Sequence, residues 1–337
     1  MAAISQVADS IGRKAFDLFS SDYPEFVQRL NADGLEKCRQ DVVYHTAYLL
    51  QAISLDRPII FDDYVHWVLE LFAALGISRE SFVTSLHAIV TAIADELSPQ
   101  SAEQAKRIVN EAVHKATPPQ WSMPSLQPEE KQYMDFLLQG QRMEALHLVQ
   151  ELLAKYGDIR RIYTLFRNVL YQVGLLWQIG KINVAQEHYI TAATQQVISH
   201  LYPHIFSQKS ALSGKVVVGA CATGELHEIG IRLVCDLLEM DGFDTHYLGA
   251  NTPVRSLIDY AAGQAADAIL LSVTLSVHLN NLQAMITSIK EDPRTKAVPI
   301  IVGGRPFYLD NNLYRAIGAD YFATDAEAVS RILAGGN

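Results

Sequence analysis

Apolar side chains recur every three or four positions through most of the first 115 residues. This spacing places them on one face of an α-helix, as in LEKCRQDVVYHTAYLLQAI (35–53) and FDDYVHWVLELFAAL (61–75). Gly76 and Ser78 lie between two such segments, where they predict the end of one helix and the start of the next. We predict about six helices and a helical domain over residues 1–116.

Proline interrupts this pattern in KATPPQWSMPSLQPEEK (115–131), because four prolines among polar residues cannot continue a helix. We therefore predict a linker over residues 117–128. Four further helical segments occupy residues 129–208, and their short connections favour an antiparallel four-helix bundle. A weaker break follows at SQKSALSG (207–214), where helical spacing gives way to strand-like runs.

Short apolar runs alternate with helical segments over residues 213–337. Such alternation is typical of a parallel sheet with helices on both faces. Five runs favour a flavodoxin-like, doubly wound sheet, whose binding site lies at the carboxyl ends of the strands. The runs are KVVVGACA, FDTHYLG, DAILLSVT, PIIVGG and DYFAT. The predicted fold class is α and α/β: a helical domain, a bundle, and a five-stranded sheet domain.

The charge balance narrows the choice of partners. The formal net charge is −10, and no basic stripe offsets it, so direct binding to nucleic acid is not expected. No apolar run is long enough for a membrane-spanning helix, and the first residues do not resemble a signal peptide. The three cysteines fit neither a zinc site nor a disulfide framework, which favours reduced thiols and a cytoplasmic location. No nucleophile–base pair or phosphate-binding loop stands out, so we expect no catalytic turnover by this chain.

One loop carries candidate metal chemistry. The sequence GELHEIG (224–230) follows the first predicted strand, so His227 is expected at the carboxyl edge of the sheet. Glu225 is placed to accept a hydrogen bond from one ring nitrogen, which would fix the tautomer and strengthen the other nitrogen as a metal ligand. Gly230 leaves room for a bulky, flat cofactor near the backbone. Taken alone, a loop histidine of this kind is more often a solvated or hydrogen-bonded residue.

Two further features join this loop at the same edge. Ser272 ends the third predicted strand, and Gly303 and Gly304 end the fourth. Together with the loop they resemble the cobalamin-binding domain family, whose signature is acidic-x-His-x-x-Gly, then Ser-x-Leu, then Gly-Gly. The resemblance implies that His227 binds cobalt in place of the cofactor's own dimethylbenzimidazole, with Glu225 behind it. It also implies that the displaced nucleotide tail runs past Ser272, Gly303 and Gly304.

Two positions depart from that signature. Glu225 stands where Asp is frequent, and Thr274 stands where Leu is usual. Both differences change reach and shape but not ligand chemistry, so the implied cobalt site stands.

The predicted bundle carries a second group of residues that bears on the cofactor. Trp177 precedes Glu187 and His188 by ten and eleven positions, and Gly180 between them is expected to end a helix. The three side chains would then lie on adjacent helices and face one site. This spacing resembles the cap of light-responsive, adenosylcobalamin-dependent repressors, over residues 129–335. The resemblance implies that Trp177 packs over the adenosyl group and Glu187 hydrogen-bonds its ribose, with His188 beside them.

By this resemblance the chain is a light sensor. Visible light would break the cobalt–carbon bond, and loss of adenosyl would change cap packing and the homo-oligomeric state. A separate effector protein would read that change, since the chain ends soon after the sheet domain. The repressors carry a DNA-binding helix-turn-helix domain, which the N-terminal helical domain replaces here. Some of them also carry a histidine directly after the cap tryptophan, where this chain has Gln178.

Two other functions compete with the light sensor. A corrinoid methyl carrier that serves separate methyltransferases would share the sheet motif, although such carriers generally lack the Trp and Glu-His group. Passive cobalamin storage would not need an aromatic helical domain.

Aromatic and imidazole side chains are dense in the N-terminal domain, which is globin-like in size. A helical domain ahead of an adenosylcobalamin light-sensor module resembles the photocobilins, which pair cobalamin with biliverdin. A linear tetrapyrrole needs aromatic walls, hydrogen-bond donors and cations for its propionates. Residue type selects His45, Tyr48, Tyr64, His66, Trp67, Arg39 and Arg57 for these roles. Cys38 could in principle form a thioether, although a single buried cysteine is more often inert. Haem, with His87 or His45 as axial ligand, is the competing cofactor. The same residues would equally serve as helix-packing aromatics with histidines at the rim.

Overall fold

The chain divides into two compact units. One unit contains the N-terminal helices together with two short segments from the C-terminal part, residues 275–284 and 305–317. The other unit contains the bundle and most of the sheet domain. The residues described by this computed structural model are 2–116, 124–207 and 213–335.

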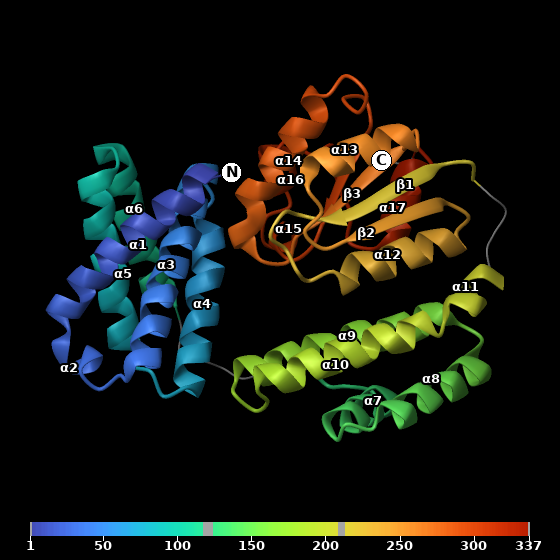
Figure 1. Ribbon diagram of the computed structural model, residues 1–337, viewed down its shortest axis with the longest axis horizontal. Coiled ribbons are helices and arrows are strands. Elements are labelled where there is room, and N and C mark those ends of the chain that lie inside the picture. Colours follow the sequence, from blue (N-terminus) through green and yellow to red (C-terminus); the bar gives the residue numbers. More distant parts are fainter. Residues whose placement is uncertain (1, 117–123, 208–212, 336–337) are drawn as a thin grey trace. The chain divides into compact units, whose positions relative to one another are not determined.

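The described part of the N-terminal domain forms six helices, in agreement with the apolar spacing (Figure 1). Side-chain caps begin three of them, because Asn31, Ser78 and Ser98 each accept a hydrogen bond from the amide three residues on. Long apolar side chains such as Phe61 and Leu86 fill the core between the helices. The helices are α1 (Ala2–Asp22), α2 (Pro24–Val27), α3 (Ala32–Leu55), α4 (Pro58–Ala74), α5 (Arg79–Glu96) and α6 (Pro99–Lys115).

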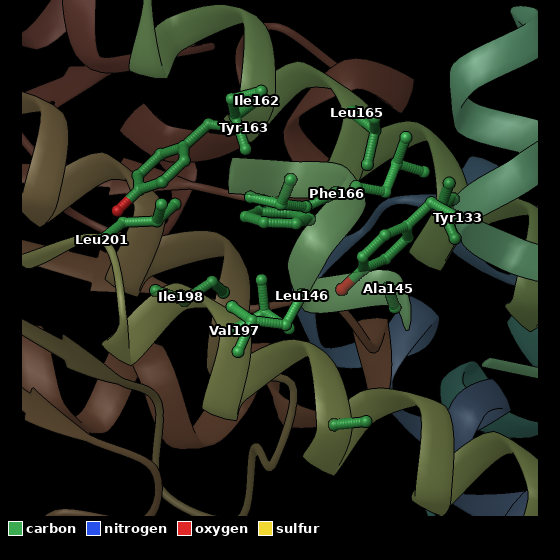
Figure 2. Packing of buried hydrophobic residues seen from close by; sticks show 14 of the residues in the cluster. Tyr133, Ala145, Leu146, Ile162, Tyr163, Leu165, Phe166, Val197, Ile198 and Leu201 are labelled. Atoms are coloured by element: carbon green, nitrogen blue, oxygen red, sulfur yellow. The ribbon is translucent and has the colours of Figure 1, made fainter. Parts of the chain in front are cut away.

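The bundle follows in the second unit. Figure 2 shows its core, in which the rings of Tyr133 and Phe166 lie 5.5 Å apart. The Tyr133 hydroxyl donates to Thr194 Oγ1 at 3.2 Å, so the one buried polar atom of that ring has a partner. Gly180 has φ +66° and stops the helix that contains Trp177, as expected. The last of the four helical segments predicted over residues 129–208 consists of two helices in the structure. The bundle helices are α7 (Pro128–Leu138), α8 (Arg142–Tyr156), α9 (Ile159–Gln178), α10 (Val184–Ser199) and α11 (Tyr202–Ser207).

Five parallel strands form the sheet in the order β2-β1-β3-β4-β5. This order is flavodoxin-like, which confirms the predicted fold class. The register pairs Cys221 with Ser272 and Ser272 with Gly303, so the carboxyl ends of three strands lie level. The strands are β1 (Val216–Cys221), β2 (Asp244–Gly249), β3 (Ala268–Ser272), β4 (Ile300–Gly303) and β5 (Tyr321–Phe322).

Helices cover the sheet because alternate strand residues point to opposite faces. On one face, buried side chains of α12 (Ile229–Met240) and α17 (Ala326–Leu333) pack against Val217, Leu270 and Ile301. The remaining connections are α13 (Val254–Gly263), a 3-10 turn η1 (Ser276–His278), α14 (Leu279–Glu291), α15 (Pro306–Leu309) and α16 (Leu313–Ala316).

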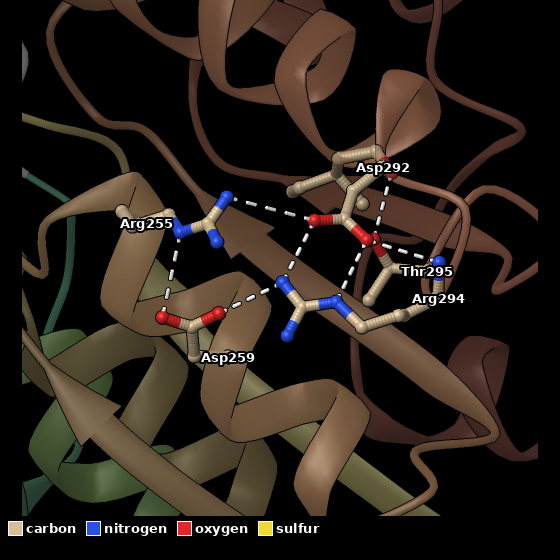
Figure 3. Close-up of polar contacts among 6 residues, drawn as sticks. Arg255, Asp259, Asp292, Arg294 and Thr295 are labelled. Carbon is tan, nitrogen blue, oxygen red and sulfur yellow. Dashed lines mark hydrogen bonds and ion pairs between the residues drawn. The ribbon is translucent and has the colours of Figure 1, made fainter.

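A charged network ties α13 to the turn before β4 (Figure 3). Arg294 Nη2 lies 2.8 Å from Asp259 Oδ1, and Arg294 Nε lies 2.9 Å from Asp292 Oδ1. Arg255 also pairs with Asp259, with 3.5 Å between Nε and Oδ2. Hydrogen bonds from Arg294 hold the pKa of the Asp292 carboxyl well below its usual range. The network therefore fixes a connection that lies outside the site described below.

Among the described helices, none has the length and apolar character needed to cross a membrane.

Candidate functional site

His227 lies on the loop between β1 and α12, and its side chain is 56% exposed. Its Nδ1 is 2.5 Å from Oε1 of Glu225, whose carboxylate is completely buried. The same oxygen accepts the backbone amide of His227 at 2.9 Å, and Oε2 accepts the amide of Thr274 at 2.7 Å. A buried carboxylate with three donors is held in one orientation, and it holds the ring in turn. Nε2 is then the ring nitrogen that can bind a metal.

The electrostatics of the loop favour a strong nitrogen ligand. The hydrogen bond that the ring donates to Glu225 raises the pKa of His227, against the opposite effect of burial. The charges of Glu225 and of Glu187 act in the same direction as that hydrogen bond. Glu187 belongs to α10 of the bundle, so the bundle and the histidine loop face one region of this unit. A more basic imidazole donates more strongly to a metal.

The loops after β3 and β4 approach each other closely beside this histidine loop. Gly304 has φ +114°, and a Cβ added there would lie 1.8 Å from the carbonyl oxygen of Val273. A Cβ on Gly303 would lie 3.3 Å from the carbonyl oxygen of Ala323. Val273 N also donates to the Gly303 carbonyl at 3.1 Å. Only glycine fits at position 304, both for its backbone angle and for the contact. Ser272 and the two glycines thus lie together at one edge.

The third position of the Ser-x-Leu element, Thr274, acts through its backbone. The Thr274 amide anchors Glu225, so the Thr274 side chain is not what orients His227. This role carried no side-chain signal in the sequence. Gly230 lies in the first turn of α12, and a Cβ there would meet no atom within 4 Å. The space beside it is therefore open.

The bundle residues are placed on adjacent helices, as the spacing suggested. Trp177 lies in the last turn of α9, half-buried against the bundle core. Glu187, in the first turn of α10, accepts hydrogen bonds from Thr191 Oγ1 at 2.8 Å and from His188 Nδ1 at 2.6 Å. The His188 side chain is 75% exposed. Gln178, directly after the tryptophan, is buried.

The seven candidates of the N-terminal domain do not form one group. His45 is 4% exposed, its Nδ1 lies 2.7 Å from the Tyr64 hydroxyl, and burial lowers its pKa to about 3. The rings of Tyr48 and Tyr64 stack with 3.7 Å between their centroids. The ring of Trp67 lies 6.4 Å from that of Tyr64, also centroid to centroid. These four side chains form an aromatic cluster between α3 and α4.

The other three candidates lie elsewhere and have partners of their own. His66 is exposed and pairs with Glu70, with 3.4 Å between Nε2 and the carboxylate. Arg39 pairs with Glu36 at 3.1 Å, and Arg57 pairs with Asp310 at 2.9 Å within the same unit. Neither of these two ion pairs involves a residue of the aromatic cluster. His87, the alternative axial ligand, is exposed on α5.

Cysteine chemistry does not stand out in this domain. Cys38 is a free, half-buried thiol, and burial raises its pKa to about 11. A thiol of that kind stays protonated near neutral pH and is a poor nucleophile.

The sheet edge fits a cobalamin cofactor. It offers one oriented imidazole with an outer nitrogen, a close approach of two loops that only glycine permits, and open space at Gly230. Residues 215–333 match a family model described as a B12 binding domain, and residues 129–202 match a second model of the same description. The matched segments together cover more than half of the chain. These segments are B12-binding domains, and the chain is a cobalamin-binding protein.

Several relatives among curated proteins are corrinoid proteins. The chain is 29% identical over 161 residues to dimethylamine corrinoid protein 3 of Methanosarcina acetivorans, covering 48% of this chain and 74% of that protein. It is 28% identical over 161 residues to the dimethylamine corrinoid protein of Methanosarcina barkeri, covering 48% and 75%. The solved structure of the Methanosarcina barkeri monomethylamine corrinoid protein aligns with TM-score 0.53 and 22% identity, over 60% of this chain and 96% of that one. That structure supports the fold.

Proposed function

We propose that this chain is the corrinoid protein of a methyl-transfer system, with His227 as the lower ligand of cobalt. The observation that carries the ligand assignment is the buried Glu225 carboxylate, which fixes Nδ1 of a half-exposed ring and leaves Nε2 outward. The methyl-transfer role is supported by the relatives, which are named as methylamine corrinoid proteins. A separate protein would deliver or remove the methyl group.

The chain's own residues divide the work of holding the cofactor. Glu225 orients His227 and is itself held by the Thr274 amide. Ser272, Gly303 and Gly304 would border the nucleotide tail, since they line the level carboxyl ends of β3 and β4. Gly230 would leave space for the corrin edge. When bound, cobalamin supplies a cobalt atom whose upper position accepts and releases a carbon group.

A second candidate function is an adenosylcobalamin light sensor. The specific observation in its favour is the group formed by Trp177 and Glu187, which come from adjacent helices of the bundle. The charge of Glu187 contributes to the raised pKa of His227, so Glu187 lies near the histidine loop. Trp177 would pack over adenine, and Glu187, with His188 beside it, would bond the ribose. Light-driven loss of adenosyl would then change bundle packing and the homo-oligomeric state.

Biliverdin in the N-terminal domain belongs to this second candidate. The aromatic cluster of His45, Tyr48, Tyr64 and Trp67 would supply the walls. His66, Arg39 and Arg57 would have to leave their present partners to take part.

One experiment tests the ligand assignment and separates the two roles. Apoprotein is loaded in the dark with methylcobalamin or adenosylcobalamin, as wild type, His227→Ala and Trp177→Ala. Loss of the histidine-bound absorption spectrum in His227→Ala is expected, and an unchanged spectrum would refute the cobalt ligand. Since light breaks any cobalt–carbon bond, photolysis alone does not discriminate.

The discriminating readouts are affinity and sedimentation. For a methyl carrier, Trp177→Ala leaves the preference between the two cobalamins unchanged, and illumination leaves sedimentation unchanged. For a light sensor, Trp177→Ala lowers the affinity for adenosylcobalamin about three- to tenfold relative to that for methylcobalamin, because an aromatic contact is lost. Illumination would then change the sedimentation of the adenosyl form. Addition of biliverdin to the same samples tests the N-terminal pigment.

A further inference from the structure

A ladder of polar contacts holds the bundle on α12, the helix that follows the His227 loop. Gln195 Nε2 of α10 donates to Glu228 Oε1 at 3.0 Å. One turn farther along both helices, Arg232 Nη2 donates to Ser199 Oγ at 3.0 Å. The four-residue spacing keeps each partner on one face of its helix. The bundle is thus attached at successive turns, each at a different distance from the histidine.

The far end of this ladder is its most buried part. Asp236, one turn beyond Arg232, is 5% exposed and accepts the hydroxyls of Tyr163 and Tyr202, both at 2.8 Å. Farther on, Arg160 pairs with Asp241 at 2.5 Å. Two charged acceptors with buried or half-buried donors make this end the stronger attachment.

The near end joins three segments through one carboxylate. Glu228 directly follows His227 at the start of α12, and its Oε1 accepts from Gln195 of the bundle. Its Oε2 accepts the amide of Ala250, in the loop after β2, at 2.9 Å. A Cβ added to Gly249 would lie 3.0 Å from that oxygen, so the loop backbone lies directly against the carboxylate.

The helix that meets Glu228 also carries Glu187, whose charge contributes to the raised pKa of His227. Glu187, Thr191 and Gln195 lie four residues apart on α10, and the first two are hydrogen-bonded to each other. Gln195 therefore lies on the same face, two turns from the carboxylate whose charge reaches His227.

We propose that Glu228 is a positioning residue that couples the His227 loop to the bundle. This inference rests on the proposed role of His227 as the cobalt ligand, but on neither choice of upper ligand. A shift of His227 on cobalt moves the next residue, so the Glu228–Gln195 hydrogen bond lengthens or shortens with it. The bundle then pivots about Asp236, which stays bonded to its two tyrosines. In the reverse direction, movement of the bundle away from α12 breaks the Gln195–Glu228 hydrogen bond, and the His227 loop loses that contact.

The test uses the full chain loaded with cobalamin, as wild type, Gln195→Ala, Ser199→Ala, Glu228→Ala and Glu228→Gln. Ser199→Ala is the matched control, because it removes the adjacent contact of the same ladder without touching Glu228. Three quantities are measured. The first is the nitrogen coupling in the electron spin resonance spectrum of the cobalt(II) form. The others are the amide exchange of residues 184–195 and the rate of cobalamin release.

We expect Gln195→Ala to speed amide exchange and cobalamin release about three- to tenfold more than Ser199→Ala does. Both variants lose one hydrogen bond to a charged group, but only Gln195 bonds the residue next to His227, whereas Ser199 bonds Arg232 one turn farther along α12. Glu228→Ala is expected to lower the fraction of cobalt with nitrogen coupling as well. Glu228→Gln, which keeps one oxygen acceptor, should restore part of that fraction. A merely structural role would change thermal stability but not nitrogen coupling.

The contrary outcomes are distinct. Equal effects of Gln195→Ala and Ser199→Ala would refute the coupling, and this comparison needs no Glu228 variant to fold. Full nitrogen coupling in a folded Glu228→Ala protein would refute the positioning role. A wild-type protein without nitrogen coupling would instead refute His227 as the ligand, and so the proposed function on which the inference rests.

Discussion

Two histidines in different units of this chain each have a hydrogen bond at Nδ1, but their surroundings are opposite. His227 Nδ1 is bonded to Glu225 at 2.5 Å, and His45 Nδ1 is bonded to Tyr64 at 2.7 Å. At the sheet edge the partner is buried and the ring is exposed. In the helical domain the ring itself is buried, edge-to-face against Phe82 with 4.9 Å between ring centroids.

The two surroundings show which features prepare an imidazole to bind a metal. The Glu225 hydrogen bond raises the pKa of His227, whereas burial lowers that of His45 to about 3. A charged partner behind an accessible ring makes a strong ligand. A neutral partner beside a buried ring makes a packing residue, whose polar atoms are satisfied inside the core.

The largest expected effect comes from Gly304→Ala. The new Cβ would meet the Val273 carbonyl oxygen at 1.8 Å, at a backbone angle of +114° that disfavours any side chain. We expect a loss of about 4 kcal/mol in the free energy of unfolding, with loss of cobalamin uptake, measured by urea denaturation and absorption.

Gly230→Ala is the matched control, because a Cβ there meets nothing within 4 Å and the residue is helical. It should raise the free energy of unfolding of the apoprotein by about 0.5–1 kcal/mol and weaken cobalamin binding. If Gly304→Ala takes up cobalamin like wild type, the sheet-edge site is wrongly placed.

His45→Ala is expected to destabilise the helical domain by about 3 kcal/mol. It removes a buried ring and leaves the Tyr64 hydroxyl without its partner. His66→Ala, two residues after Tyr64 and exposed, should stay within about 0.5 kcal/mol of wild type. Both variants should keep the cobalamin spectrum, and a changed spectrum in His45→Ala would break the separation between the regions.

The sheet and the place of the His227 loop at its edge were predictable because their signals are local. Strand runs end at Ser272 and Gly303, and parallel strands bring such ends to one edge. The Thr274 amide was not predictable, since a backbone donor leaves no mark in a side-chain pattern. In the N-terminal domain, helical geometry alone predicts that the proposed pigment residues do not all face one pocket. Tyr64 and His66 are two residues apart on α4, so they point to opposite sides and could not line one pocket.

Glu225→Gln tests the charged partner of His227, the proposed cobalt ligand. Glutamine keeps an oxygen for the His227 ring, but it loses the charge and the second acceptor that holds the Thr274 amide. We expect cobalamin affinity to fall about 10- to 100-fold, measured by dialysis or by the rate of cobalamin release. Tyr64→Phe removes the hydrogen-bond partner of His45 and should leave cobalamin affinity unchanged. Equal affinity in Glu225→Gln and wild type would show that the carboxylate only supports the loop.

The smallest effect is the pH dependence of unfolding. His45 has a pKa of about 3 when folded and about 6.5 when unfolded, so between these values the unfolded chain binds more protons. Stability therefore falls as the pH drops below about 6.5, by up to about 1.4 kcal/mol per pH unit from this residue. His45→Gln, which can bond Tyr64 but does not titrate, should flatten urea-unfolding free energies measured at about pH 6.5 and about pH 5. His227→Gln should act in the opposite direction, because a raised pKa stabilises the folded chain at low pH. Its effect should be smaller, since the ring is half-exposed. Equal slopes in His45→Gln and wild type would mean that the helical domain opens before His45 titrates, and the buried ring would then not mark a closed core.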